Sequence, residues 1–119
     1  MVDLNEVTLG SKQERSESDI CKEWIGKYVI IRTYSAGVHA GFLFKKSGNE
    51  VILKNSRRLW AWHTKQGISL SSVATYGIEE SKSKICEQLD FLWLEAIEII
   101  PTKREAFDSI SNAPVAKAE

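Results

Sequence analysis

Residues that could bind a phosphate gather around a short loop of small side chains. The loop Ser35-Ala36-Gly37 separates two segments rich in β-branched and aromatic residues, so the chain turns back on itself here. Small side chains leave main-chain N–H groups accessible, and a glycine permits the positive φ that lets successive amides converge on an anion. Arg32 and His39 flank the loop. A hairpin that needs a glycine only for its turn explains the same residues, so both interpretations stay open.

A second group of candidate residues follows later in the chain. Arg57 and Arg58 could each donate paired hydrogen bonds to a phosphate. The rings of Tyr34, Trp60 and Trp62 offer surfaces on which a nucleobase can stack. If the segment is a strand, period-two alternation puts Arg58, Trp60 and Trp62 on one face. The alternative is that the tryptophans fill a core or an interface and the arginines form a solvated rim.

Lys103 and Arg104 form a third basic group. Both fall in the first turn of a predicted helix, where the helix dipole disfavours cations. The segment Thr102-Lys-Arg-Glu105 matches a capping box, which predicts that the helix begins there and continues through Ile110. A bound anion would compensate for the unfavourable charges, so both residues are candidate ligand contacts.

The residue patterns of common hydrolases and metal enzymes do not occur in this chain. His39 is followed by Ala-Gly and His63 by Thr-Lys, so neither forms the His-x-Thr/Ser motif of two-histidine phosphoesterases. A nucleophile elbow, a Walker loop and a dinucleotide glycine fingerprint do not occur either. Cys21 and Cys86 are far apart and lack a second ligand at zinc-site spacing. We therefore expect a protein that is not an enzyme, with no catalytic residue, no metal site and no cofactor.

Composition favours one soluble domain that binds an anion locally. The hydrophobic fraction of 43% and charged fraction of 27% are ordinary for a globular protein, and no apolar run is long enough to span a bilayer. A formal net charge of zero argues against a general nucleic-acid coat protein, so we expect no membrane and no long nucleic acid as partner. Basic residues nevertheless concentrate in residues 21–65, between acidic flanks. This segregation indicates an anion site, or self-association of basic and acidic segments.

The predicted elements indicate an α+β fold, a twisted antiparallel sheet of about five strands with two or three short helices. Strands are expected over residues 28–34, 38–46, 50–54 and 57–63, with a hairpin turn at 47–49 and a break at Asn55-Ser56. One or two further strands are expected in 85–100, ending at Pro101. Helices are expected from Ser18 or Asp19 to Gly26, over 69–77 and over 102–110. Domain boundaries follow: a flexible arm over 1–18, one ligand-binding domain over 19–112 and a tail over 113–119.

Four segments resemble a family of small phage proteins associated with the Thoeris anti-defence sponges. They are YVIIRTYSAGVHAG (28–41), EVILKNSRRLWAW (50–62), ISLSSVA (68–74) and EAIEIIP (95–101). The resemblance covers roughly residues 27–114 in the same order. It departs from the family pattern at 64–67 and 81–86, which look longer or more polar, so no stacking residue is transferred there.

The resemblance implies a non-enzymatic protein that sequesters a cyclic nucleotide immune signal. The signal would be a cyclic ADP-ribose isomer made by bacterial TIR-domain enzymes, bound so that the downstream effector is not activated. The resemblance also implies a homo-oligomer, a dimer or a larger assembly such as a hexamer. Its ligand pockets would lie between subunits, with separate pockets for cyclic oligonucleotides, in the cytoplasm of an infected bacterial host. Loop 35–37 and the pair Arg57-Arg58 would contact phosphate.

Two other function classes stay open on the sequence. One is a phage structural or regulatory module whose Arg/Trp strand docks a protein or nucleic-acid partner. The other is a nuclease or phosphodiesterase, which the absence of catalytic motifs disfavours. Release of intact ligand on heat denaturation would distinguish a sponge from both.

Overall fold

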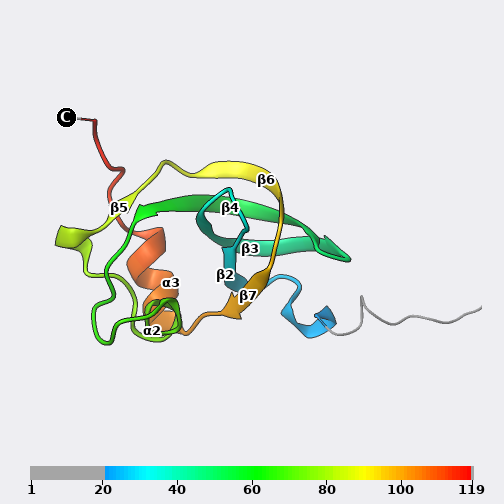
Figure 1. Cartoon of the computed structure of the whole chain (residues 1–119), viewed down its shortest axis with the longest axis horizontal. Helices are drawn as coiled ribbons and strands as arrows, with labels where there is room; N and C mark the ends of the chain where they lie inside the picture. The colour runs from blue at the N-terminus through cyan, green and yellow to red at the C-terminus, as the bar shows by residue number, and fades with distance from the viewer. Residues whose placement is uncertain (1–20, 119) are drawn as a thin grey trace, which may run out of the picture.

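Six antiparallel strands and two α-helices make up residues 21–118, the part of the chain described by this computed structural model (Figure 1). The strands are β2 (Tyr28–Arg32), β3 (Val38–Ser47), β4 (Glu50–Ala61), β5 (Lys84–Ile85), β6 (Leu89–Glu95) and β7 (Glu98–Pro101). The helices are α2 (Leu70–Tyr76) and α3 (Arg104–Ser111), with short 3₁₀ turns η1 (Lys22–Trp24) and η2 (Glu80–Lys82). The predicted α+β class is confirmed, with six strands where about five were expected.

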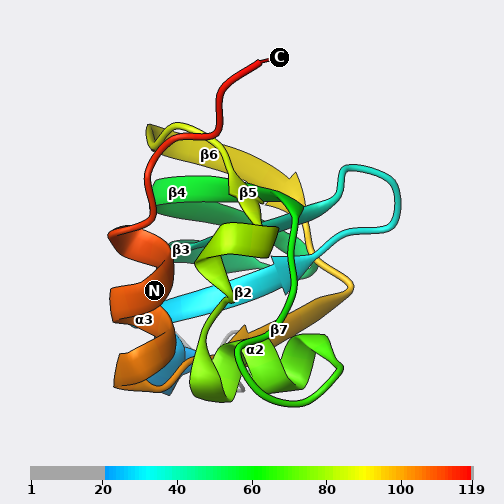
Figure 2. The ribbon, with the colours of Figure 1, turned by 90° about the vertical axis from the view of Figure 1, so that its left-hand side faces the viewer.

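The sheet is strongly curled, so that the short segment Ala96-Ile97 joins strand β6 on one side to strand β7 on the other. Figure 2 shows β6, β4, β3, β2 and β7 stacked in that order, with β5 continuing the same edge of β4 as β6. Only Ala96 and Ile97 separate β6 from β7, so these two outer strands must approach each other. The N–H of Ala96 donates to the carbonyl of Asn49, and that of Ile97 to the carbonyl of Arg32. The sheet is therefore barrel-like, with an inner and an outer face.

The two faces bury separate apolar clusters. Strand β2 contributes to both, because alternation directs Ile30 outward and Val29 and Ile31 inward, and all three are fully buried. This confirms that the first predicted strand is central and covered on both sides. The inner cluster comprises Val29, Ile31, Leu43, Val51, Leu53, Leu94 and Ala96. The outer cluster joins the sheet to α2 and α3 through Tyr28, Ile30, Ala40, Leu59, Val73, Ala74, Ile78, Ile85, Ile110 and Ala113.

Strand β4 runs unbroken through the interruption predicted at Asn55-Ser56. Asn55 takes a positive φ of 53°, and the pairing with β3 changes register nearby, between Ala40 and Phe42. A bulge at Asn55 therefore accommodates the predicted break, and the strand continues through it. The predicted strands 50–54 and 57–63 are thus one strand, and the prediction of two was wrong. The second half of this long strand carries Arg57, Arg58 and Trp60.

Some elements begin and end where the sequence predicts, and others do not. Helix α2 has the predicted N-cap, Ser69, and ends at Gly77, whose φ is 96°. Strand β2 stops at Arg32, two residues earlier than predicted, because the loop begins there. Segment 84–101 forms three strands, where one or two were expected, and it ends at Pro101 as predicted. The hairpin turn predicted at 47–49 joins β3 to β4.

The predicted capping box at 102–105 was wrong, although the helix exists. Lys103 is the N-cap of α3 and makes no capping hydrogen bond with its side chain. The hydroxyl of Thr102 instead donates to the carbonyl of Tyr28, which fixes the entry to the helix against β2. After α3, the N–H of Ala116 donates to the carbonyl of Ile85, so the predicted tail is attached to the sheet edge.

The expected helix from 18 to 26 is a 3₁₀ turn, η1, within the described residues. Its first residues and the predicted arm over 1–18 lie outside them. None of the helices in residues 21–118 has the length and apolarity needed to cross a membrane.

Candidate functional site

The loop between β2 and β3 holds its shape through internal hydrogen bonds. The N–H and hydroxyl of Thr33 both donate to the carbonyl of Gly37, at 3.1 and 2.8 Å. The N–H of Ala36 donates to the hydroxyl of Thr33 at 2.8 Å, and Gly37 takes the positive φ expected of it, 85°. Ala36 therefore has no free amide for a ligand. The amides of Tyr34, Ser35 and Gly37 have no acceptor within residues 21–118, and all three residues are exposed.

His39 supports this loop from below. Its side chain is buried, and Nε2 lies 2.8 Å from the carbonyl oxygen of Ala36. Because a carbonyl only accepts, Nε2 carries the proton of the neutral ring. Burial lowers the pKa of His39, the hydrogen bond to Ala36 opposes that effect, and the charge of Arg58 adds to it. His39 is therefore a neutral residue that positions the loop, where the sequence suggested a direct phosphate contact.

Arg57 does not join the loop. Only 4% of it is exposed, and its guanidinium donates to three carbonyls, those of Cys86 at 2.8 Å, Ile110 at 2.9 Å and Ala113 at 2.6 Å. Two of these acceptors lie at the C-terminal end of α3, where the helix dipole favours a cation. The assignment of Arg57 to phosphate binding is thus corrected: it is a buried tie between the sheet and the helix.

Arg58 and Trp60 do join the loop. His39 and Arg58 are direct partners in the β3–β4 ladder, which brings Arg58 beside the residues that follow the turn. Arg58 is exposed, and Trp60 is 70% exposed. Together with Ser35, Ala36 and Gly37 they line a hollow of about 310 Å³. The structure therefore brings together two groups that the sequence identified separately.

Trp62, Tyr34 and Arg32 lie elsewhere. Trp62 packs against the outer apolar cluster, because β4 ends before it and the register shift next to β5 interrupts the alternation. The expectation that Trp62 shares a face with Arg58 was wrong. Tyr34 is 90% exposed and lines a separate hollow across the loop, next to Ala96. Arg32 forms an exposed ion pair with Glu98, with Nε 2.8 Å from the carboxylate.

Lys103 and Arg104 are also separate from the loop. Both stand at the start of α3, the helix that packs on the outer face of the sheet. Nε of Arg104 lies 3.1 Å from a carboxylate oxygen of Asp108, one turn later in the same helix. This ion pair supplies the negative charge that the sequence argument sought in a ligand. Neither residue lines a hollow with the loop.

A second hollow, of about 390 Å³, adjoins the first and shares Arg58 and Trp60 with it. Its other walls include Ser56, Cys86 and Glu87. Sequence reasoning missed Ser56, which it assigned to a break between two strands, and it did not assign Cys86 or Glu87 to a binding site. We call loop 35–37, His39, Ser56, Arg58 and Trp60 the candidate site. Both hollows fall near the lower end of the range for small-molecule sites.

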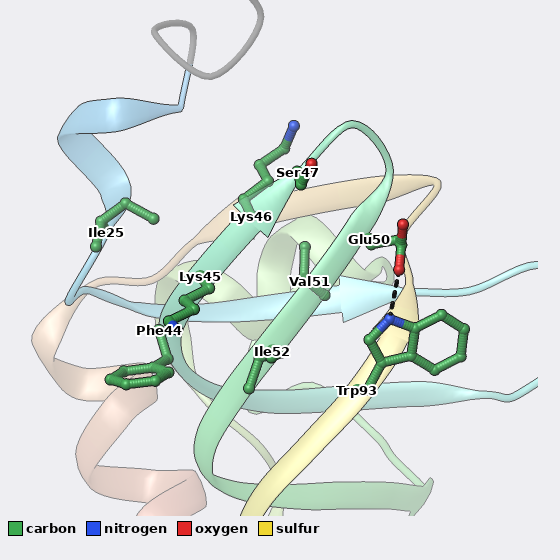
Figure 3. A pocket seen from close by; sticks show the side chains of 9 residues that line it. All are labelled: Ile25, Phe44, Lys45, Lys46, Ser47, Glu50, Val51, Ile52 and Trp93. Carbon is green, nitrogen blue, oxygen red and sulfur yellow. Dashed lines mark hydrogen bonds between the residues drawn. The ribbon is translucent and has the colours of Figure 1, made fainter.

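An apolar groove of about 480 Å³ lies away from the candidate site (Figure 3). Ile25 lines it from the segment before β2, Phe44 from β3 and Ile52 from β4. On the opposite side, Nε1 of Trp93 donates to a carboxylate oxygen of Glu50 at 2.9 Å. None of the site residues predicted from the sequence lines this groove.

We expect the buried His39 to make the stability of the free protein depend on pH. The unfolded chain protonates this residue near pH 6.5, whereas the folded ring stays neutral to lower pH. Between the two pKa values the unfolded state binds more protons, so the free energy of unfolding falls as the pH drops below about 6.5. Thermal midpoints measured from pH 7.5 to 5 check this, with His39→Gln as the comparison. A pH slope as steep in His39→Gln as in the natural protein would contradict it.

Comparison with known proteins identifies one family. A family model described as a domain of unknown function, DUF6948, matches residues 26–110, more than two thirds of the chain. That range includes every residue of the candidate site. No curated protein and no solved structure matches the chain. Among residues 21–118 no group of three His, Cys, Asp or Glu side chains is placed to hold a metal ion. By the extent of the family match, the chain belongs to the DUF6948 family.

Proposed function

We propose that this protein binds a small phosphorylated nucleotide signal at the candidate site and sequesters it unchanged. The observation that supports this most strongly is that loop 35–37 lines one hollow together with Arg58 and Trp60 of strand β4. The resemblance described above makes a cyclic ADP-ribose isomer the ligand to test first, bound in the cytoplasm of an infected bacterial host.

The chemistry of the site fits such a ligand. The amides of Ser35 and Gly37 and the guanidinium of Arg58 are donors suited to phosphate oxygens. No carboxylate within residues 21–118 forms an ion pair with Arg58, so its charge is available. The exposed ring of Trp60 offers a stacking surface for a base.

The same geometry favours binding over turnover. A general base must reach the proton that it removes. His39, the one imidazole in the candidate site, is buried and directs its Nε2–H at the carbonyl of Ala36. The site therefore supplies donors suited to hold a phosphate.

Heat release of the ligand tests this function. The protein is mixed with a cyclic ADP-ribose isomer, filtered to remove free ligand, denatured by heat and analysed by chromatography. We expect the intact isomer in the released fraction. Chemically altered ligand would indicate an enzyme, and ligand that passes the filter freely would indicate a docking module; either result would overturn the proposal.

We further propose that the protein forms a homo-oligomer through the sheet face next to the apolar groove. Along β4 and β6, the outward pairs are Glu50–Glu95, Ile52–Trp93 and Lys54–Phe91. Along β4 and β6 this face is therefore acidic at one end, apolar in the middle and basic at the Lys54 end, and Lys45 of β3, the ladder partner of Ile52, lines the groove beside the apolar middle. A two-fold axis through the middle would place the glutamates of one copy against Lys54 of the other. The exposed rings of Phe44, Phe91 and Trp93 would be buried by that contact.

Trp93→Lys is expected to convert the oligomer to a monomer. Near a two-fold axis the new lysines of two copies would face each other, and the apolar centre would be lost. Light scattering coupled to size exclusion should give a multiple of 13.4 kDa for the natural protein and 13.4 kDa for the variant. Ile68→Lys is the control, because Ile68 is an exposed apolar residue in the loop before α2. A natural protein that is monomeric at tens of micromolar would contradict the proposal.

A further inference from the structure

Two buried polar atoms in the wall of the second hollow have no hydrogen-bond partner within the described residues. They are Nδ1 of His39 and Oγ of Ser56. Each side chain is about 1% exposed, and both residues line the hollow that Arg58 and Trp60 also line. Buried polar groups are nearly always paired in folded proteins, because an unpaired one loses its hydrogen bonds to water without replacement. A ligand group that fills the hollow would supply the missing bonds.

Strand pairing places the two atoms on one face of the sheet. His39 pairs with Arg58 across the β3–β4 ladder, and Ser56 lies two residues before Arg58 on β4. Side chains two apart on a strand share a face, so Ser56, Arg58 and the partner His39 all face the same side. Gly41 keeps the backbone close here, since a Cβ at that position would come within 3.0 Å of Cα of Ser56.

The hydrogen-bonding roles of the two atoms define what they can bind. Nε2 of His39 donates to the carbonyl of Ala36, so Nδ1 of the neutral ring is an acceptor only. Oγ of Ser56 can donate and accept. A phosphate dianion cannot donate to Nδ1, whereas a hydroxyl can donate to Nδ1 and accept from Ser56 at once.

We propose that the second hollow binds a sugar hydroxyl of the ligand, so that the site recognises ribose phosphates in preference to phosphate alone. This inference rests on the proposed function, and it assigns separate tasks to the two hollows. The loop amides and Arg58 hold the phosphate. His39 and Ser56, in the wall of the second hollow, bind the sugar hydroxyl. Trp60 lines both hollows.

Ser56→Ala tests this inference without disturbing the fold. We expect affinity for cyclic ADP-ribose, measured by calorimetry, to fall about tenfold, while the weaker affinity for inorganic pyrophosphate stays unchanged. Because the hydroxyl has no partner in the free protein, the thermal midpoint without ligand should not fall. A purely structural serine would instead lower the midpoint and weaken both ligands together. Ser47→Ala, at the end of β3 beside the apolar groove, is the matched control and should change neither affinity.

The outcomes separate this inference from the proposed function. If the natural protein binds neither cyclic ADP-ribose nor pyrophosphate, the proposed function fails and the inference with it. If it binds both but Ser56→Ala leaves cyclic ADP-ribose affinity intact, the inference alone is overturned. That result is expected if a water molecule, and not the ligand, satisfies the two atoms.

If Ser56→Ala does weaken cyclic ADP-ribose binding, deoxygenated analogues of cyclic ADP-ribose identify the hydroxyl. The analogue that lacks it should bind the natural protein and Ser56→Ala equally.

Discussion

Replacing Arg57 by methionine is expected to lower the free energy of unfolding by about 3 to 5 kcal/mol. The substitution leaves the carbonyls of Cys86, Ile110 and Ala113 without the guanidinium that they share. It also removes the cation at the C-terminal end of α3. Domains of this size are stabilised by only about 5 to 15 kcal/mol in total, so the variant should be near the limit of folding.

Urea denaturation followed by tryptophan fluorescence measures this effect. Arg58→Met is the matched control, since the same change one residue later removes an exposed side chain that forms no ion pair within the described residues. We expect that control to shift stability by less than about 0.5 kcal/mol. Equal losses in the two variants would contradict the structural role assigned to Arg57.

Arg58→Ala is expected to weaken ligand binding by roughly 1.5 to 3 kcal/mol, or about 10- to 150-fold, while the fold stays intact. The reason is the loss of one charge-assisted contact to phosphate in the hollow formed with loop 35–37. Calorimetry with cyclic ADP-ribose measures the affinity, and circular dichroism confirms that the variant is folded.

Arg104→Ala provides the control for charge. Arg104 is an exposed arginine on α3, paired with Asp108 and separate from the candidate site. Its removal should leave the affinity unchanged. If Arg58→Ala has no effect, or if Arg104→Ala weakens binding as much, Arg58 is not the phosphate contact and the candidate site is wrongly placed.

The two neighbouring arginines show what sequence reasoning could achieve. Alternation along a strand predicts that Arg57 and Arg58 face opposite sides. It does not predict which side is covered, because the three carbonyls that bind Arg57 come from residues 86, 110 and 113. Contacts between residues this distant in sequence depend on the tertiary fold. The same limit explains Trp62, whose orientation depends on a register shift beside β5.

Local features were predicted more accurately. The turn with Gly37, the cap at Ser69 and the end of the last strand at Pro101 depend on residues within a few positions, and all agree with the structure. Ser56 shows the opposite case. Asn55 and Ser56 are typical turn residues. In the structure, Asn55 lies in a bulge, and Ser56 is buried in the wall of the second hollow. No pattern in the sequence distinguishes that bulge from a break.

The most direct test of the account is an amide NMR titration of the protein with cyclic ADP-ribose. Donation from the loop amides to phosphate should shift the signals of Ser35 and Gly37 most strongly, and the indole signal of Trp60 should move with them. The amide of Ala36 should shift less, because it already donates to Thr33. Shifts confined to the apolar groove around Phe44 and Trp93, or no shifts at saturating ligand, would contradict the claim that these amides and Arg58 hold the signal.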